Sequence, residues 1–565
     1  MDFDAIVVGS GMSGGWAAKE LCERGLKVLV IERGAHVTHG EDYLDYKEPW
    51  ELDNLGKVPE DELERDYHIQ KECYAFTTAN KRFWVKDSDH PYITPEGRPF
   101  HWLRGYHLGG RSLLWARHSY RWSDLDYEAN SKDGHGVDWP IRYADTKPWY
   151  DHVERFAGIS GSKEGIPNLP DGEFLPAMEL NVVEKAFKAN IESHFPGRKL
   201  IMGRVAHLTQ TTEEQDALGR GACQYRDFCY RGCSFGAYFS ALSATLPAAQ
   251  RTNNLTIVTD TIGHSVIYDP ATGRASGVRV IDQNTKQGRT YTARIVFLCA
   301  SAIGSAQIML NSTSEHFPTG IANKSDQVGR NLMDHISGIR ISGTVPGYED
   351  RYYAGRRPAG FYIPRYRNLN NEQGGSFVRG FGFQGGAGRE DWARGGWEAG
   401  VGEDLKNRLR TPGKWSLSIS GFAEMLPHPD NRVTLHHSRK DKWGIPLLII
   451  DCIHRENDNK LIAQAFDDGE EMIRAMGCTD ISVGRAEGAK NPGFGIHEAG
   501  TARMGRDPAT SVLNGWNQAH DVQNLFVTDG ACFASGACQN PSLSYMALSA
   551  RAANHAADLM QQGAL

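Results

Sequence analysis

The pattern of apolar and polar positions at the start of the chain predicts a strand, a helix and a second strand. Apolar runs at 5–8 and 28–31 flank a helix-compatible segment at 16–24. Glycines in G-x-G-x-x-G spacing separate the first run from the helical segment: Gly9, Gly11 and Gly14. This order of elements is typical of a dinucleotide-binding βαβ unit, whereas isolated glycines of this kind also occur in ordinary tight turns.

Each glycine has a physical reason in such a unit. The first lets the chain turn, the second lets the backbone approach a pyrophosphate, and the third lets the helix lie close to the strand. The helix N-terminus offers free N–H groups and a positive dipole end to the phosphates. Glu32 ends the second strand, where it can accept a hydrogen bond from a ribose hydroxyl, and Arg33 follows it.

The pattern predicts further elements along the first and last parts of the chain. An amphipathic segment at 180–191 favours a helix. Alternation favours short antiparallel strands at 255–258, 265–268 and 277–281, with turns at 269–270 and 272–273. A buried strand at 294–299 leads through small residues, including Ser301, to a helix at 305–310. Near the end, a strand at 525–527 runs into Asp529 and Gly530, and a helix follows at 543–560.

Residues 345–490 differ in character and predict a second domain with its own sheet, closing over the first. Strands are expected at 415–423, 432–435 and 447–450, and a long helix at 458–476. A glycine-rich stretch at 374–397 contains aromatic residues that could stack on a ligand, although such clusters are more often core: Phe377, Phe381, Phe383, Trp392 and Trp397. Possible hydroxyl-binding groups are Arg379, Gln384 and Glu424. Residues 43–102 have an irregular pattern, and we interpret them as a long segment that runs over the surface or toward another domain.

Composition and charge narrow the class of protein. The chain has 565 residues, 40% hydrophobic and 23% charged, as in ordinary globular enzymes. Its net charge of −7, without a basic stripe, argues against a nucleic-acid partner. No apolar run is long enough to span a membrane. Met1 and Asp2 lead directly into the first strand without a signal peptide, which by itself indicates a cytoplasmic protein.

Three of the ten cysteines stand apart from the rest. Cys223, Cys229 and Cys233 have the spacing C-x5-C-x3-C in a loop rich in glycine and aromatic residues. Thiolates at such short spacing suit an iron–sulfur cluster or zinc, whereas a disulfide would leave one of the three unpaired. The other cysteines lie mostly in apolar or mixed segments, where a buried thiol is expected.

Five motifs in order give the chain a resemblance to a known family. They are the N-terminal glycine fingerprint, the pair Gly109-Gly110, SAIGSAQIMLNS from Ser301, HEAGTARMG from His497, and the NLFVTDG…QNPSLS ending. Together they resemble the glucose–methanol–choline (GMC) oxidoreductases, and the resemblance runs from residue 4 to 555. It implies an α/β fold with a Rossmann-like FAD-binding domain and a substrate domain built on an antiparallel sheet.

The resemblance also implies domain boundaries and site residues. The FAD domain would comprise 1–165, 215–340 and 490–565, with a cluster loop at 222–235, and the substrate domain 166–214 and 341–489. His497 would be the catalytic base and Asn540 its partner. The residues expected at the cofactor are Gly9, Gly11, Gly14, Glu32, Arg33, Arg104, Gly109, Gly110, Ser112, Ser301, Asp529, Gly530, Asn540 and Pro541.

His497 and Asn540 together suit the oxidation of an alcohol. A neutral imidazole can take the hydroxyl proton while hydride leaves for the flavin, and an amide can donate to the developing alkoxide. Some relatives attach the flavin to a histidine immediately before a tryptophan; here Leu114 precedes Trp115, so we expect noncovalent FAD. His107 and His118 lie nearby but not at that position.

The cysteine spacing resembles the cluster loop of bacterial FAD glucose dehydrogenases and glucoside 3-dehydrogenases. That resemblance implies a 3Fe–4S cluster, a cytochrome c-type electron acceptor, and a small accessory subunit with an export signal that takes the enzyme to the periplasm. The stretch 108–130 favours oxidation of a glucoside at C3 to a 3-keto-glucoside. Alternatives are a glucose 1-dehydrogenase or gluconate-type dehydrogenase, an oxygen-using oxidase, a lyase with a structural flavin, and a noncatalytic electron-transfer subunit.

Overall fold

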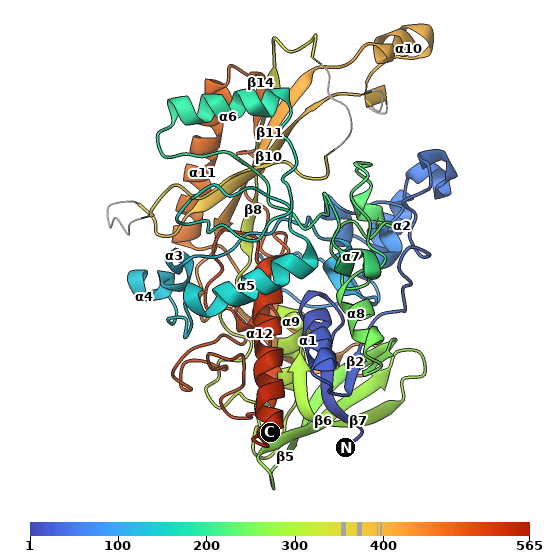
Figure 1. Ribbon diagram of the computed structural model, residues 1–565, viewed down its shortest axis with the longest axis vertical. Coiled ribbons are helices and arrows are strands. Elements are labelled where there is room, and N and C mark those ends of the chain that lie inside the picture. Colours follow the sequence, from blue (N-terminus) through green and yellow to red (C-terminus); the bar gives the residue numbers. More distant parts are fainter. Residues whose placement is uncertain (352–356, 370–375, 392–393, 396–397) are drawn as a thin grey trace.

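A computed structural model describes residues 1–351, 357–369, 376–391, 394–395 and 398–565 (Figure 1). The helices are α1 Met12–Glu23, α2 Glu60–Asp66, α3 Asp124–Tyr127, α4 Ala129–Asp133, α5 Tyr143–Ala157, α6 Val182–His194, α7 Glu213–Ala217, α8 Thr245–Arg251, α9 Ala302–Asn311, α10 Gly402–Arg410, α11 Glu456–Ala475 and α12 Ser542–Gln561. The strands are β1 Phe3–Val8, β2 Val28–Ile31, β3 Ile201–Met202, β4 Leu255–Val258, β5 Thr261–Asp269, β6 Arg274–Asp282, β7 Gly288–Leu298, β8 His335–Val345, β9 Phe361–Ile363, β10 Phe381–Arg389, β11 Trp415–Glu424, β12 Arg432–Lys440, β13 Pro446–Asp451, β14 Thr479–Val483 and β15 Leu525–Val527.

The first sheet brings the ends of distant strands to one edge. Its order is β4-β2-β1-β7-β6-β5, and β15 pairs with β7. The pairs β1–β2, β1–β7, β2–β4 and β7–β15 are parallel. In this register Val8 lies beside both Ile31 and Leu298, and Leu298 lies beside Val527. The residues that follow these strands therefore gather at their carboxyl edge, which is where open α/β sheets bind ligands.

Helices α1 and α12 lie together against this sheet, although they come from opposite ends of the chain (Figure 1). Their small residues pack with the apolar face of β7 and β15, as in the cluster that contains Ala17, Leu21, Phe297, Phe526 and Ala553. Close approach of the helices is possible because many of these side chains are alanine. Burial of this apolar surface stabilises the βαβ unit that carries the glycine turn.

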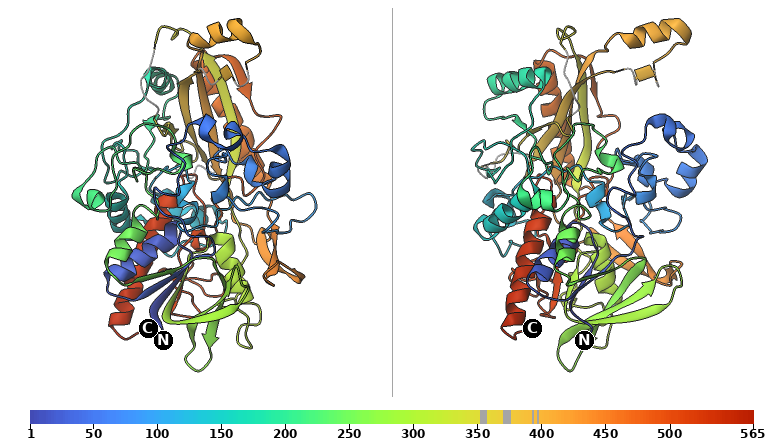
Figure 2. Two further views of the ribbon diagram at one scale, coloured as in Figure 1. Left: turned by 90° about the vertical axis from the view of Figure 1, so that its right-hand side faces the viewer. Right: turned by 45° about the vertical axis from the view of Figure 1, so that its right-hand side comes forward.

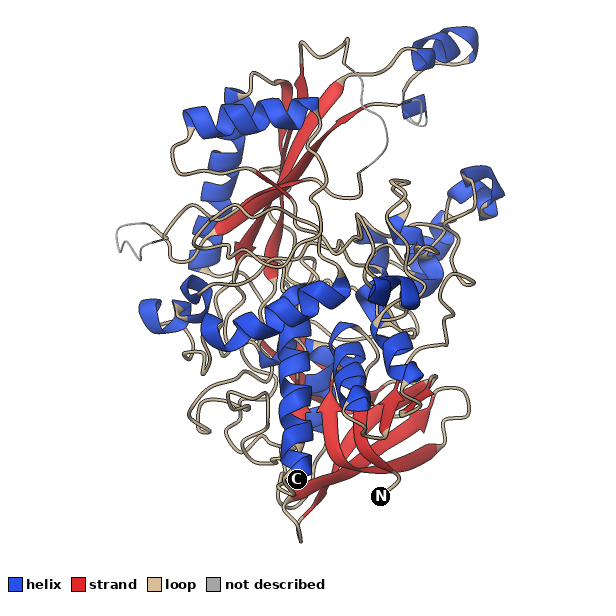
Figure 3. Cartoon of the chain, in the orientation of Figure 1, coloured by secondary structure: helices blue, strands red, loops and turns tan. Residues whose placement is uncertain are grey.

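The second sheet lies at the other end of the molecule (Figures 1 and 2). Its order is β14-β8-β11-β10-β9-β3, and the pairs along it are antiparallel. Helices α6 and α11 lie beside it (Figure 3). Their apolar residues, such as Phe187 and Leu461, share a core with Ile339, Phe383 and Leu417 of the strands.

The fold class expected from the sequence is confirmed, with differences in strand pairing. Strand β4, expected in an antiparallel set, instead pairs parallel with β2, because it continues the nucleotide-binding sheet. Strands β12 and β13 form a separate two-stranded sheet and do not join the second sheet. Strand β8 begins at His335, slightly before the expected boundary at 341, and the domain boundaries stay predictions. Within the described residues, no helix combines the length and apolar character needed to span a bilayer.

Candidate active site

A cavity of about 860 Å³ is lined by the carboxyl edge of the first sheet and by strands β8, β10 and β11 of the second. Most of the residues expected at the cofactor or in catalysis line it: Gly9, Gly11, Glu32, Arg33, Arg104, Gly110, Ser112, Ser301, His497, Asp529, Gly530 and Asn540. Gly14, Gly109 and Pro541 do not line it. Gly109 instead donates its N–H to Ser10 Oγ at 2.9 Å, and Pro541 caps the start of α12.

The glycine turn has the geometry that a pyrophosphate requires. Gly9 has φ +101°, and a Cβ there would lie 2.3 Å from the carbonyl oxygen of Cys299. A Cβ on Gly14 would lie 1.9 Å from the carbonyl oxygen of Gly9, so the helix packs directly on the turn. Gly11 is the N-cap of α1, and a Cβ there would meet nothing nearer than Gly109 O at 3.9 Å. The open side of Gly11 thus faces the cavity at the positive end of a helix.

Glu32 is buried and already holds the turn in place. Its Oε2 accepts hydrogen bonds from the N–H (3.1 Å) and Oγ (2.5 Å) of Ser10, and its Oε1 accepts from Gly34 N–H at 2.8 Å. Burial raises the pKa of this carboxyl, although these donors oppose the shift. A carboxylate oxygen can accept more than one hydrogen bond, so Oε1 can still accept a ribose hydroxyl.

Arg33 and Arg104 line the same part of the cavity but are held by protein groups. The Arg33 guanidinium lies 4.6 Å from the Tyr106 ring centroid and 3.2 Å from Nδ1 of His90. Arg104 donates to the carbonyl of His90 at 2.9 Å and lies over the ring of Trp102. Both arginines therefore contribute positive charge to the cavity wall while they are bound by neighbouring protein groups.

The turn after β7 and the turn after β15 meet at Asp529. Its Oδ2 accepts from Ser305 Oγ at 2.5 Å and its Oδ1 accepts from Ala531 N–H at 2.9 Å. Burial raises the pKa of Asp529 to about 6. Ser301, in a strained conformation with φ +72°, precedes α9 and lines the cavity beside it. A strained residue at a ligand edge is a common mark of a functional turn.

His497 is positioned by a buried carboxylate and a second histidine. Asp334 Oδ1 accepts from the backbone N–H of His497, and its Oδ2 accepts from those of Gly493 and Gly495, each at 2.8 Å. His335 Nδ1 lies 2.8 Å from His497 Nδ1. Burial holds the pKa of His497 well below its usual range, and the neighbouring His335 and Arg111 lower it further. His497 is therefore neutral near pH 7 and able to accept a proton.

Asn540 lines the cavity from the segment before α12. The side-chain amide of Gln384 on β10 donates to Oδ1 of Asn540, which leaves the Asn540 amide N–H groups to donate elsewhere. Gln384, predicted as a possible hydroxyl-binding group, also lines the cavity. Sequence reasoning had no signal for its pairing with Asn540, since the two residues are 156 positions apart.

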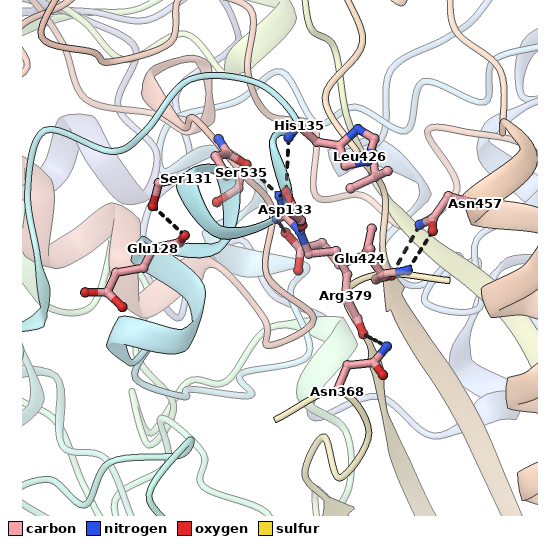
Figure 4. Close-up of polar contacts among 12 residues, drawn as sticks. Glu128, Ser131, Asp133, His135, Asn368, Arg379, Glu424, Leu426, Asn457 and Ser535 are labelled. Carbon is pink, nitrogen blue, oxygen red and sulfur yellow. Dashed lines mark hydrogen bonds and ion pairs between the residues drawn. The ribbon is translucent and has the colours of Figure 1, made fainter. Parts of the chain in front are cut away.

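Arg379 and Glu424 bind each other and do not line the cavity, so a structural function fits both better than the binding of substrate hydroxyls (Figure 4). Arg379 is 3% exposed; it also bonds to Asp133 and donates to Asn130 Oδ1 at 2.7 Å. A buried guanidinium is stable only when carboxylates pair with it. The guanidinium of Arg379 is paired in this way and is therefore not available to a ligand in the cavity. Trp392 and Trp397, expected among the sugar-stacking aromatics, lie outside the described residues, as do positions 374 and 375 of the glycine-rich stretch.

The three clustered cysteines are free thiols in a loop against the cavity wall. Tyr230, the neighbour of Cys229 in sequence, lines the cavity. Cys229 Sγ lies 3.6 Å from Nε2 of His207, and burial raises the pKa of Cys229 to about 11. In the part of the chain that the structure describes, no three side chains of His, Cys, Asp or Glu are arranged to hold a metal ion. The three thiols are nevertheless of the donor type that a cluster needs.

These features are those of a dinucleotide-dependent redox enzyme: a glycine turn suited to a pyrophosphate, an acid suited to a ribose, and a neutral histidine and an asparagine that line the same cavity. Two profiles of the GMC oxidoreductase family match the sequence, one over residues 3–337 and the other over 427–549. The chain belongs to the GMC oxidoreductases. The open approach at Gly11 and the spare acceptor on Glu32 fit FAD, which this family binds.

Curated relatives match nearly the whole chain. The 2-methyl-1,2-propanediol dehydrogenase of Mycolicibacterium austroafricanum is 28% identical over 98% of this chain and 94% of its own. The paromamine 6'-oxidase of Streptomyces fradiae is 28% identical, covering 98% and 90%. The fructose dehydrogenase large subunit of Gluconobacter japonicus is 25% identical, covering 99% and 98%. A crystal structure of pyridoxine 4-oxidase from Mesorbium loti has the same fold, with TM-score 0.59, 18% identity and 98% of each chain covered.

Sequence reasoning missed three residues that shape the site. Asp334, His335 and Arg111 all act through neighbours far away in the chain. Arg111 binds the buried carboxylate of Glu498 at 2.8 Å and so fixes the backbone beside His497. For Asp334 and His335, the only sequence signal was that an acidic residue and a histidine stand next to each other at the start of a strand.

Proposed function

We propose that this protein is an FAD-dependent dehydrogenase that oxidises a ring hydroxyl of a pyranoside, at C3 of glucosides, to a 3-keto-glucoside. The observation that carries the oxidation chemistry is the neutral His497 in the wall of the cavity, with Asn540 lining the same cavity. FAD, when bound, supplies a two-electron acceptor for the hydride. His497 takes the hydroxyl proton, and the Asn540 amide donates to the oxygen as negative charge develops there.

A sugar substrate is supported by the polar character of the cavity at its second sheet. The strands contribute hydroxyl and amide groups there, from Ser418, Ser420 and Gln384. Small side chains on these strands leave room for a ring, and several polar groups suit a molecule with many hydroxyls. Among the relatives, the names fructose dehydrogenase and paromamine 6'-oxidase are consistent with this substrate class.

A sugar whose anomeric hydroxyl is blocked distinguishes oxidation at C3 from oxidation at C1. Methyl glucoside has no free anomeric hydroxyl, so a glucose 1-dehydrogenase cannot oxidise it. We expect the purified protein to bleach its flavin with methyl glucoside under anaerobic conditions, and the product to be a 3-keto-glycoside by NMR. Reduction by free glucose alone, with a lactone as product, would replace the proposal with the C1 alternative, and gluconate is tested in parallel. Flavin that stays oxidised with every sugar would favour the lyase reading.

We extend the proposal to the electron path: Cys223, Cys229 and Cys233 would hold a 3Fe–4S cluster, and the cluster would supply one-electron transfer to a cytochrome c-type acceptor. Three free thiols in one loop support it, as does Tyr230 of the same loop, which lines the cavity. We expect three irons per flavin and an electron paramagnetic resonance signal from the oxidised protein. Cys229→Ser should lose the iron while sugar still bleaches the flavin. Flavin without iron or sulfide in the wild-type protein would exclude the cluster.

The location and assembly follow from the same proposal. A relative named as a large subunit is consistent with a partner chain here. We propose a small accessory subunit that carries the export signal, so that the enzyme reaches the periplasm. Expression with and without that partner, followed by cell fractionation, tests this, because a cytoplasmic enzyme would stay with the cell contents in both cases.

Acid precipitation tests whether the FAD is bound noncovalently, because a noncovalently bound flavin would stay in the supernatant.

An oxidase is the second candidate, because a relative covering nearly the whole chain is named an oxidase. Oxygen consumption with sugar and no added dye or cytochrome distinguishes the two. Turnover with oxygen as fast as with cytochrome c would favour the oxidase.

A further inference from the structure

We propose that His335 is a positioning residue that fixes the tautomer of His497, so that Nε2 of His497 is the atom that takes the substrate proton. The proposal rests on the proposed function, because it assigns an atom to the proton transfer in that reaction. His335 lies on β8 of the second sheet, whereas His497 lies in the loop after β14. The two histidines are 162 positions apart in sequence and meet only in the fold.

The contact between the rings requires a single shared proton. His335 Nδ1 and His497 Nδ1 are 2.8 Å apart, and the ring planes are inclined at 80°. A hydrogen bond of this length forms only if one nitrogen carries hydrogen and the other offers a lone pair. Burial lowers the pKa of both rings, so each is neutral and each carries one hydrogen.

The second nitrogen of His335 decides which ring donates. Its Nε2 lies 3.1 Å from the carbonyl oxygen of Gly536, which can only accept a hydrogen bond. The hydrogen of His335 is therefore on Nε2, and its Nδ1 has a lone pair. His497 must then carry its hydrogen on Nδ1, which leaves Nε2 with a lone pair. The orientation of a catalytic imidazole by the partner of its other nitrogen is a general device.

The groups around His335 keep its ring in place. His335 is 4% exposed, and in the register of the sheet it lies opposite Glu424 on β11. Glu424 is held by Arg379, and its Oε2 is a buried oxygen without a hydrogen-bond partner. Its charge favours protonation of His335, while Arg111 and His118 disfavour positive charge on His497. Of these groups, Glu424 thus acts on the charge of His335, whereas Arg111 and His118 act on that of His497.

The proton balance of the step is simple. The O–H bond of the substrate breaks and its proton forms a new bond to Nε2 of His497, while the two electrons of the C–H bond leave as hydride to the bound FAD. His497 becomes an imidazolium whose Nδ1–H still donates to the lone pair of His335 Nδ1. The hydrogen bond strengthens as charge develops, because its donor becomes cationic.

A matched pair of variants tests the proposal. Asparagine and leucine have nearly the same shape, but only asparagine offers an oxygen near the position of Nδ1. Both lose the bond to Gly536, so any shared loss of stability cancels in the comparison. We expect His335→Asn to reduce the anaerobic rate of flavin bleaching at saturating sugar by less than about fivefold, and His335→Leu by about 100-fold, in line with the loss of a general base. The sugar concentration for half-maximal rate should differ little between them.

Histidine-selective ¹⁵N NMR supplies a readout independent of turnover. The signals of His497 are assigned by their loss in His497→Gln. We expect wild-type His497 to show a protonated Nδ1 and an unprotonated Nε2, and the Leu variant to lose this preference. A protonated Nε2 in the wild-type protein, or equal bleaching rates for the Asn and Leu variants, would overturn the proposal. If the Leu variant fails to fold, the wild-type spectrum decides alone. If no sugar bleaches the wild-type flavin, the proposed function fails, while the spectrum still tests the tautomer.

Discussion

The side-chain amide of Gln384 on β10 donates a hydrogen bond to Oδ1 of Asn540, so the second sheet orients a residue that belongs to the end of the chain. With Oδ1 occupied, the amide hydrogens of Asn540 are free to point into the cavity. A donor aimed in advance at a developing oxyanion contributes more than one that must reorient. The other member of the pair, His497, also has a partner on the second sheet, because His335 of β8 lies within hydrogen-bond distance of it.

Replacement of Gln384 should therefore slow catalysis without removing the flavin. Methionine fills similar space but cannot hold Oδ1, so we expect Gln384→Met to bleach flavin about tenfold more slowly. Gln384→Glu places a carboxylate against Oδ1 and should slow it further, because repulsion turns the Asn540 amide around. Stopped-flow absorbance measures both, with flavin content as the control. A Met variant as fast as wild type would mean that Asn540 is oriented by something else.

The pattern of apolar and polar residues predicted the elements that depend only on a short segment of the chain. The strand, glycine turn and second strand were placed within a residue or two, as were β15 and α12, because each depends on a short periodic segment. The positions of His497 and Asn540 came from motifs. Asp334, His335 and the Arg379–Glu424 pair could not be found in this way, since their partners are set by the packing of two sheets. A buried arginine and a substrate-binding arginine look alike in sequence.

The second and third glycines of the fingerprint, Gly11 and Gly14, have different functions, which substitution by alanine can separate. In Gly14→Ala the new Cβ would lie 1.9 Å from Gly9 O, so helix and turn must move apart. We expect the free energy of unfolding to fall by about 1–3 kcal/mol even without flavin. In Gly11→Ala the new Cβ meets no protein atom closer than 3.9 Å, so the flavin-free protein should keep its stability but lose most of its flavin affinity.

Urea unfolding of the flavin-free proteins and titration with FAD measure the two effects. We expect Gly14→Ala to lose stability but not because of the flavin, and Gly11→Ala to lose affinity for FAD while it keeps its stability. Equal stability of the two flavin-free variants would show that Gly14 is not a packing position. Unchanged FAD affinity in Gly11→Ala would place the pyrophosphate elsewhere.

Removal of Arg379 should destabilise the contact between α4 and β11. Its guanidinium bonds to both Glu424 and Asp133, and Glu424 is fully buried. Arg379→Met leaves a buried carboxylate without its cation, and we expect a loss of about 3–5 kcal/mol in the free energy of unfolding. The double variant Arg379→Met with Glu424→Gln should recover part of that loss, because no uncompensated charge remains. An additive double variant would indicate that the two residues do not interact.

The pKa of Asp334 makes a prediction about stability against pH. Burial and the nearby Glu498 raise this pKa to about 7, although the backbone N–H groups that Asp334 binds oppose the shift. The native protein therefore retains a proton between about pH 4 and pH 7 that the unfolded chain has released. Stability falls with rising pH wherever the native state binds more protons. Asp334 should thus contribute a loss of at most about 1.4 kcal/mol per pH unit in that window.

Asp334→Asn isolates this contribution because asparagine does not titrate. The variant loses one acceptor for the backbone of the His497 loop and should be less stable than wild type at pH 5. That difference should narrow as the pH rises from 5 to 7, since only the wild-type protein must release the proton. Urea unfolding of both proteins at intervals of half a pH unit measures it. Parallel curves would mean that Asp334 is already ionised at pH 5, and that the backbone donors outweigh the cost of its burial.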